Sequence, residues 1–123
     1  MWQLGAGLQR FGLQCLEFDA SFGCHLDISD DAVWLPLAAD IRSGRFCGLM
    51  AVLPYDTFTH GGGSLAVPAV RGLEGSSRYG LKDIPQESKA VLRLHNLLIQ
   101  RVATSLQHLI SEGKTVCCAA AAS

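Results

Sequence analysis

The sequence predicts an α/β fold: a partial, mostly parallel sheet with flanking helices and one long C-terminal helix. Short apolar runs alternate with helical patterns along the 123 residues, and such alternation is typical of parallel strands joined by crossover helices. The last helical pattern is the longest. The composition is 49% hydrophobic and 17% charged, which is typical of a buried α/β core.

Three short apolar runs are the predicted strands. Residues 13–19 (LQCLEFD) and 45–53 (RFCGLMAVL) end at acids or at a proline, as buried strands often do at their carboxyl ends. Residues 115–122 (TVCCAAAA) form the third run. Because helical patterns separate the runs, we expect all three strands to lie parallel in one sheet.

The first predicted helix covers 32–43. Ser29 or Asp30 can cap it, since a side-chain oxygen at that position accepts from the first helical N–H groups. Pro36 removes one backbone donor and should kink the helix. Gly44 offers a stop, because glycine readily adopts the left-handed conformation that ends many helices.

The second predicted helix covers 83–112. Asp83 and Gln86 have the spacing of a capping box, and Gly113 marks the end. Apolar residues recur at steps of three and four along it, which predicts one buried stripe. Its members are Val91, Leu94, Leu98, Val102, Leu106, Leu109 and Ile110.

Residues 54–82 are predicted to form one long irregular loop within a single domain that covers 1–123. A loop of this length in a compact domain is usually functional or disordered. The formal net charge of −1 gives no global attraction to nucleic acid or acidic lipid. The five cysteines match neither a zinc site nor a disulfide framework, so we expect a reducing compartment and no metal. No run is long and apolar enough for a membrane span.

Ligands of open parallel sheets bind outside the carboxyl ends of the strands. Gly5-Ala6-Gly7 is therefore either a close approach to a ligand or an ordinary tight turn. Glu17 or Asp19 could hold a ribose hydroxyl, or could be solvated acids. Arg71, Arg78 and Lys82 make the long loop mildly basic, which fits a solvated loop or a phosphate-contacting surface.

The order of these segments resembles that of S-adenosylmethionine-dependent methyltransferase-like domains related to the cytosine-C5 DNA methyltransferases, which are common in mobile-element sequences. The similarity covers most of residues 5–116. It is carried by "SGRFCGLMAVLPYDTF", where the family has a strand and a Pro-Pro-Cys-Ser-Thr-Phe loop, and by "RYGL" and "HN" farther along. The resemblance implies a Rossmann-like sheet, with S-adenosylmethionine as cofactor and DNA as partner.

The resemblance assigns a role to eight positions of this sequence. It implies that Gly5 and Gly7 hold the methionine part of the cofactor, Asp19 the ribose and Asp27 the adenine. Catalytic positions fall on Pro54 and Tyr55, with Tyr55 in the place of the cysteine nucleophile. Substrate-binding positions fall on Thr57 and Phe58, and the basic character of the long loop adds Arg71 and Arg78 as candidate substrate contacts.

Tyr55 is the main departure from the family. Cytosine C5 is unreactive until a thiolate adds to C6, and a tyrosine with a pKa of about 10 cannot replace it. Amino-methyltransferases use a Pro-Pro-Tyr loop but need a polar residue before it, where this chain has Val52-Leu53. The first strand and the glycine loop also look clipped, and the Glu-Asn that protonates the base is missing, so we expect a truncated domain.

The function that follows is a degenerate, catalytically inactive DNA-methyltransferase-like domain inside the cell, in cytoplasm or nucleus. Its affinity for S-adenosylmethionine should be weak or lost, and its unpaired strand edges favour a homo-oligomer. Two alternatives stay open. One is an active amino- or small-substrate methyltransferase that uses the Pro54-Tyr55 loop. The other is a small α/β interaction or structural module without a cofactor.

Overall fold

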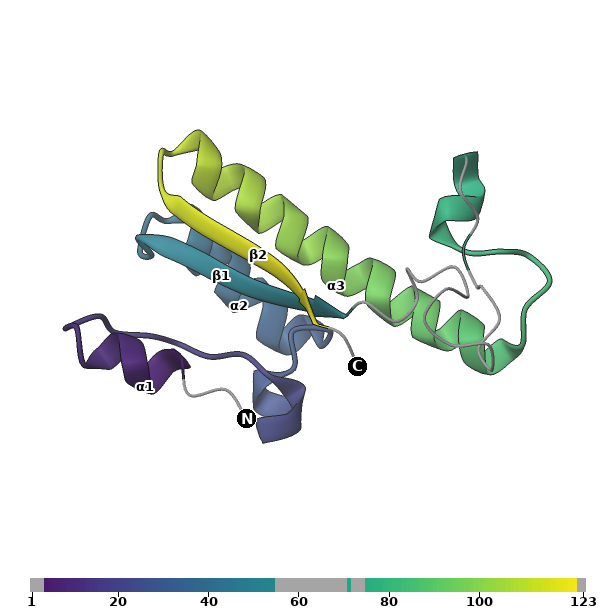
Figure 1. The fold of residues 1–123 in the computed structure, drawn as a ribbon, viewed down its shortest axis with the longest axis horizontal. Coiled ribbons are helices and arrows are strands. Elements are labelled where there is room, and N and C mark those ends of the chain that lie inside the picture. Colours follow the sequence, from purple (N-terminus) through teal and green to yellow (C-terminus); the bar gives the residue numbers. More distant parts are fainter. Residues whose placement is uncertain (1–3, 55–70, 72–74, 122–123) are drawn as a thin grey trace. The chain divides into compact units, whose positions relative to one another are not determined.

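The computed structural model describes residues 4–54, 71 and 75–121. The chain divides into two compact units, Met1–Leu37 and Ala38–Ser123, which we call unit 1 and unit 2. Helices and a two-stranded sheet alternate along the chain (Figure 1). The predicted mixed α/β class with a long C-terminal helix is therefore confirmed.

Unit 1 contains short helical turns. They are α1 (Leu4–Gln9) and the 3₁₀ turns η1 (Ala20–Phe22) and η2 (Cys24–Leu26). The helix α2 (Asp31–Arg42) begins in unit 1 and ends in unit 2. Asp30 caps it as predicted, since Asp30 Oδ1 accepts from the Ala32 N–H at 2.9 Å. The helix continues through Pro36.

Gly5 and Gly7 lie inside α1, so the turn predicted for Gly5-Ala6-Gly7 is wrong. The chain leaves the helix through a turn at Gly12, which has a φ of 80°. The Gly12 N–H donates to Gln9 O at 3.0 Å, and the Leu13 N–H donates to Leu8 O at 3.2 Å. This pair of bonds is the Schellman motif, and its glycine is the stop signal that the sequence interpretation overlooked.

The predicted strand over 13–19 is also wrong, because these residues have no regular secondary structure. Their apolar character alone does not make a strand, since a strand needs a neighbour that exchanges backbone hydrogen bonds with it. In the part of the chain that the structure describes, the sheet consists of two other strands. The expected third parallel strand is thus missing from it.

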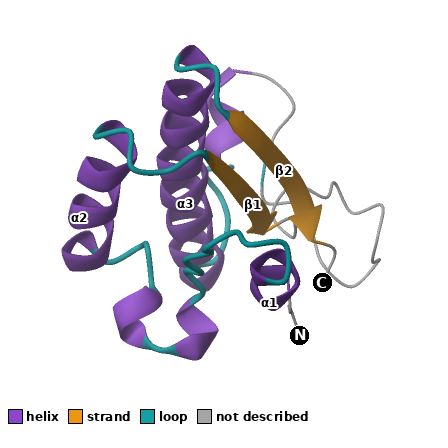
Figure 2. Ribbon diagram, turned by 90° about the vertical axis from the view of Figure 1, so that its left-hand side faces the viewer, coloured by secondary structure: helices purple, strands orange, loops and turns teal. Residues whose placement is uncertain are grey.

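Those two strands are β1 (Gly48–Pro54) and β2 (Thr115–Ala121), and both belong to unit 2. They pair in parallel, from Gly48 opposite Thr115 to Pro54 opposite Ala121 (Figure 2). The predicted parallel pairing of these two runs is confirmed. A Cβ on Gly48 would stand 2.7 Å from Thr115 O, so the pairing begins where only glycine fits.

The long helix α3 covers Gln86–Ser111 and packs along both strands (Figures 1 and 2). The capping box predicted for Asp83 and Gln86 is wrong: the cap residue is Pro85, without a side-chain hydrogen bond, and Gln86 is the first helical residue rather than the third. The predicted stop is confirmed. Gly113 has a φ of 74°, and the Lys114 N–H reaches Leu109 O at 2.9 Å.

The buried hydrophobic residues of unit 2 come from α3, which packs on the sheet, and from the C-terminal half of α2. The predicted apolar stripe of α3 is buried only in part. Val102 is buried and Leu109 is 0% exposed, whereas Val91 and Leu94 in the first half of the helix are more than two-fifths exposed. Leu98 and Leu106 are half-buried. The buried hydrophobic residues are Ala38, Ile41, Leu92, Val102 and Leu109.

Candidate functional site

Asp19 and Asp27, the two acids expected to hold the cofactor, are engaged in their own turns. Asp19 Oδ1 accepts from the Ser21 N–H at 2.9 Å and from Ser21 Oγ at 2.8 Å. Asp27 Oδ1 accepts from the Ser29 N–H at 2.9 Å and from Ser29 Oγ at 2.7 Å. The two turns share the pattern Asp-x-Ser, which is an Asx turn in each case.

These hydrogen bonds stabilise the charged form of both acids. The backbone N–H of Ser21, followed by its hydroxyl, lowers the pKa of Asp19. The hydroxyl of Ser29, followed by its backbone N–H, lowers the pKa of Asp27. Both carboxylates are therefore anions that shape local backbone. Gly5 and Gly7 lie in a regular helix of the same unit, where their backbone does not form a ligand-facing loop.

The expected catalytic loop is described only at its first residue. Pro54 is the last residue of β1, at the carboxyl end of the strand. Tyr55, Thr57 and Phe58 lie outside the described residues. Pro54, Arg71 and Arg78 belong to unit 2, and the four cofactor residues belong to unit 1. The single cleft expected to unite them stays a prediction.

Arg71 forms the best-defined polar cluster of unit 2. Only 4% of the residue is exposed. Its Nη1 donates to Arg78 O and to Asn96 Oδ1, both at 2.8 Å. Asn96 Nδ2 in turn donates to Tyr79 O at 2.9 Å. Arg71 and Asn96 together hold the 3₁₀ turn η4 (Gly75–Tyr79) on the side of α3.

Burial decides what this arginine can do. Desolvation lowers the pKa of Arg71 from its usual value, because a buried guanidinium loses its hydration. A donor whose Nη1 already bonds a carbonyl and an amide oxygen is a positioning group rather than a surface phosphate ligand. Arg78 is the opposite case, since its carbonyl is bound inside the cluster while its side chain is exposed. The sequence interpretation gave both arginines the same role.

Gly80 completes the seat of η4 on α3. Its φ is 141°, and a Cβ there would lie 2.9 Å from Leu92 Cδ1. Leu92 is 3% exposed, so the chain passes directly over a buried side chain. The sequence places Asn96 and Arg71 on two elements 25 residues apart, and no local pattern joins them. The glycine of "RYGL" is the only local signal of the close approach.

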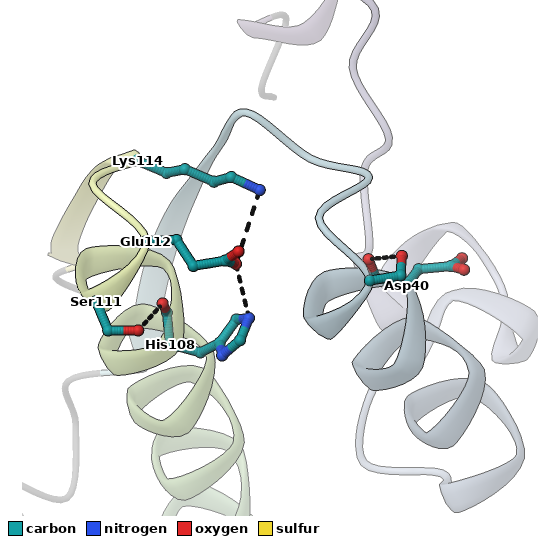
Figure 3. Close-up of polar contacts among 6 residues, drawn as sticks. Asp40, His108, Ser111, Glu112 and Lys114 are labelled. Carbon is teal, nitrogen blue, oxygen red and sulfur yellow. Dashed lines mark hydrogen bonds and ion pairs between the residues drawn. The ribbon is translucent and has the colours of Figure 1, made fainter.

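A second polar cluster lies at the C-terminal end of α3 (Figure 3). His108 Nε2 is 2.7 Å and Lys114 Nζ is 3.8 Å from Glu112 Oε1. Both nitrogens are inaccessible to solvent and have no partner in hydrogen-bond geometry. The contact of Lys114 with Glu112 is therefore charge pairing, and so is the contact of His108 when that side chain is protonated. Cations near a helix C-terminus are favourable. The spacing of His108 and Glu112 by four residues could have revealed the pair.

An exposed ion pair joins Arg45 Nη1 to Oδ2 of Asp40, a residue of α2, at 3.0 Å. The chemistry available here is limited. Among the described residues, no three His, Cys, Asp or Glu side chains are grouped so that they could hold a metal ion. No helix in the same part of the chain has the length and apolar character needed to cross a membrane.

The chain was compared with protein-family models, curated proteins and solved structures, and none of them matches it.

Proposed function

We propose that this chain is a degenerate, catalytically inactive DNA-methyltransferase-like domain with a partial Rossmann-like sheet. The proposal starts from the resemblance in segment order. It is supported by the parallel β1–α3–β2 unit, in which Pro54 ends β1. A catalytic loop of the family would begin at that residue, outside the carboxyl end of a parallel strand.

The observation that carries the loss of activity is the local structure of the cofactor residues. Asp19 and Asp27 each direct Oδ1 at a serine two residues later. Gly5 and Gly7 lie within the helix α1. A cofactor that bound through these groups would have to replace the two capping interactions and unwind α1. Together with a tyrosine at position 55, this leaves S-adenosylmethionine weakly bound or unbound.

Calorimetry with S-adenosylmethionine tests the cofactor part of the proposal. We expect no resolvable heat, or a dissociation constant above about 1 mM, for the wild type. Asp27→Ala tests the predicted adenine contact, and Asp83→Ala is the matched control from unit 2. Tight binding by the wild type that Asp27→Ala abolishes and Asp83→Ala preserves would overturn the loss of the cofactor.

Methyl transfer from labelled cofactor to DNA tests the catalytic part. We expect no transfer by the wild type or by Tyr55→Cys. A single restored thiol cannot recover a set of groups that act as a unit, because the base-protonating residues are also needed. Transfer by the wild type would identify an active enzyme. Transfer by Tyr55→Cys alone would mean that the remaining groups are complete.

DNA is the partner that this proposal implies, and it places the protein in the cytoplasm or the nucleus. Of the two arginines assigned to DNA, Arg78 is the one with an exposed side chain. An Arg78→Ala variant should therefore weaken any DNA binding more than Arg71→Met does at a temperature where both variants are folded.

A second function, an α/β interaction module without a cofactor, is favoured by one observation. Unit 1 leaves large apolar side chains on its surface, among them Phe11 at 84% and Leu16 at 59% exposed. Extended apolar exposure marks interaction surfaces in soluble proteins. The calorimetric and transfer experiments do not separate this function from the first, because both predict a protein without cofactor chemistry. A measurement of binding to another protein chain does separate the two functions.

A further inference from the structure

The two units carry opposite charge. Unit 1 has one arginine against five acidic residues, a formal charge of −4. Unit 2 has nine lysines and arginines against six acidic residues, a formal charge of +3. The net charge of −1 for the whole chain hides this division. Surfaces of opposite sign attract one another over about 10 Å at moderate salt.

Unit 1 lacks a core among its described residues. No side chain from 7 to 37 is buried. The acidic residues alternate there with exposed apolar ones, so that the same short stretch offers both charge and apolar surface. We call residues 11–31 the acidic segment. Its exposed large apolar side chains are Phe11, Leu13, Leu16, Phe18 and Phe22, and its acids are Glu17, Asp19, Asp27, Asp30 and Asp31.

Unit 2 carries a surface of complementary character. We call it the basic face, and it consists of Arg78, Lys82, Lys89 and Arg93. Lys89 and Arg93 are four residues apart and share one side of α3. Arg78 and Lys82 are brought to α3 by the bond from Asn96 to Tyr79 O and by the close approach of Gly80 to Leu92.

Exposed apolar side chains accompany the basic face as well. Tyr79 is 72% exposed and Leu81 is 37% exposed. Two acids, Asp83 and Glu87, lie in the same stretch of sequence and reduce its attraction for a polyanion such as nucleic acid. The combination of basic and apolar groups fits an acidic protein segment with apolar side chains better than it fits a phosphate backbone.

We propose that the acidic segment of one copy of this chain binds the basic face of a second copy. Unit 1 does not itself cover the apolar side chains of the acidic segment, since no side chain from 7 to 37 is buried, and the basic face of a second copy can supply that cover. Each copy offers both surfaces. A reciprocal exchange about a two-fold axis satisfies both and closes the assembly as a dimer. The inference does not depend on the methyltransferase-like function.

The mass of the protein in solution, measured by sedimentation equilibrium, tests the proposal. At low salt we expect a dimer that dissociates as sodium chloride is raised, because screening weakens contacts between exposed charges. The double variant Arg78→Glu/Arg93→Glu reverses the basic face, and Glu17→Lys reverses a charge of the acidic segment. Each should weaken self-association about tenfold or more. Arg42→Glu, an exposed helical arginine outside both surfaces, is the matched control and should leave it unchanged.

Mixing the two charge-reversal variants gives the decisive test. The Arg78→Glu/Arg93→Glu variant presents an intact acidic segment, whose partner is the intact basic face of Glu17→Lys. The mixture should therefore associate more tightly than either variant does alone. A wild type that stays monomeric at low salt would overturn the proposal, as would self-association that ignores salt and charge reversal. A monomer that binds a DNA duplex through Arg78 and Arg93 would assign the basic face to nucleic acid instead.

Discussion

Unit 1 and unit 2 differ in what holds their backbones in place. In unit 2, residues far apart in the sequence meet: β1 pairs with β2, and Arg71 reaches Asn96 on α3. In unit 1, the hydrogen bonds that shape the backbone are local, such as Asp19 to Ser21 and the bonds that end α1 at Gly12. Unit 2 has a core with Leu109 fully buried, whereas Phe11 in unit 1 is 84% exposed.

The two units therefore draw their stability from different sources. Burial of apolar side chains supplies most of the free energy of folding, and only unit 2 has it among the described residues. Caps and turns contribute about 1 kcal/mol each and cannot offset the entropy of ordering a long segment. We therefore expect unit 2 to unfold cooperatively and unit 1 to lose its structure at a lower free energy, unless a partner covers it.

Replacing a core residue should give the largest effect. Leu109→Ala removes a side chain with 0% exposure and should lower the free energy of unfolding by about 2–5 kcal/mol. Phe11→Ala, a larger truncation at an exposed site of unit 1, should change it by less than about 0.5 kcal/mol. Urea unfolding followed by circular dichroism measures both. An equal loss in the two variants would mean that unit 1 shares the core.

The Arg71 cluster should give the next largest effect. Arg71→Met keeps an apolar stem of similar length but leaves Arg78 O and Asn96 Oδ1 without this donor. A buried acceptor without its partner costs about 1–3 kcal/mol. Arg78→Met is the matched control, because it removes an exposed side chain and keeps the bonded carbonyl.

Hydrogen exchange locates the effect of Arg71→Met. We expect faster exchange in residues 75–80 and unchanged exchange in β1 and β2. Exchange that accelerates throughout unit 2 would mean that Arg71 supports the whole core. No change in either region would contradict the role of the cluster in holding η4 on α3.

Glycine-to-alanine substitutions test the two units with changes of the same size. Gly48→Ala in unit 2 places a methyl group 2.7 Å from Thr115 O, so the start of the strand pair must shift, at a cost of about 1–3 kcal/mol. Gly7→Ala in unit 1 meets nothing within 4 Å inside α1. Alanine in a helix interior is favourable there by about 0.5–1 kcal/mol.

Far-ultraviolet circular dichroism and urea unfolding separate these two effects. Gly7→Ala should raise the helical signal without moving the urea midpoint of unit 2. Gly48→Ala should lower that midpoint and leave the helical signal of the folded protein unchanged. A destabilising Gly7→Ala would revive the interpretation of Gly5 and Gly7 as a ligand-facing turn.

The sequence predicts the features of this chain that depend on local chemistry. The cap at Asp30 and the stop at Gly113 are as predicted. The parallel pair of apolar runs in unit 2 is not local, but it is also as predicted, because helical patterns between apolar runs favour parallel strands. The strand over 13–19 is not, because a strand depends on a neighbour that its own residues do not specify. The predicted capping box does not form, because Gln86 is the first residue of α3 and not the third.

The candidate site was predictable to a smaller extent. The sequence singled out Arg71 and Arg78 as residues of one loop, but their different exposure follows from a contact with Asn96, 25 residues from Arg71. Such a contact leaves no periodic signal. The resemblance implies cofactor contacts for the acids at positions 19 and 27, and the end of a predicted strand also favours Asp19, whereas the nearby serines at 21 and 29 indicate Asx turns. Where a hydrogen bond to a residue close in the sequence accounts for a polar side chain, that role is preferred to a contact with a ligand.

The smallest effect expected concerns the pH dependence of the two Asx turns in unit 1. The pKa of Asp19 and that of Asp27 are both lowered from 3.8 by hydrogen bonds to serine. A carboxyl group with a folded-state pKa below its unfolded value stabilises structure above the unfolded pKa, and this stabilisation disappears as the pH falls through the folded pKa. The turns should therefore open only below about pH 4, and opening one turn should leave the core of unit 2 intact.

Amide NMR signals of Ser21 and Ser29, followed from pH 5 to pH 2, should each titrate with a midpoint below 3.8. Asp19→Asn should abolish the titration at Ser21 and preserve it at Ser29, and Asp27→Asn should do the reverse. Midpoints at or above 3.8 would mean that the carboxylates do not cap these turns, and would make them available again for the cofactor.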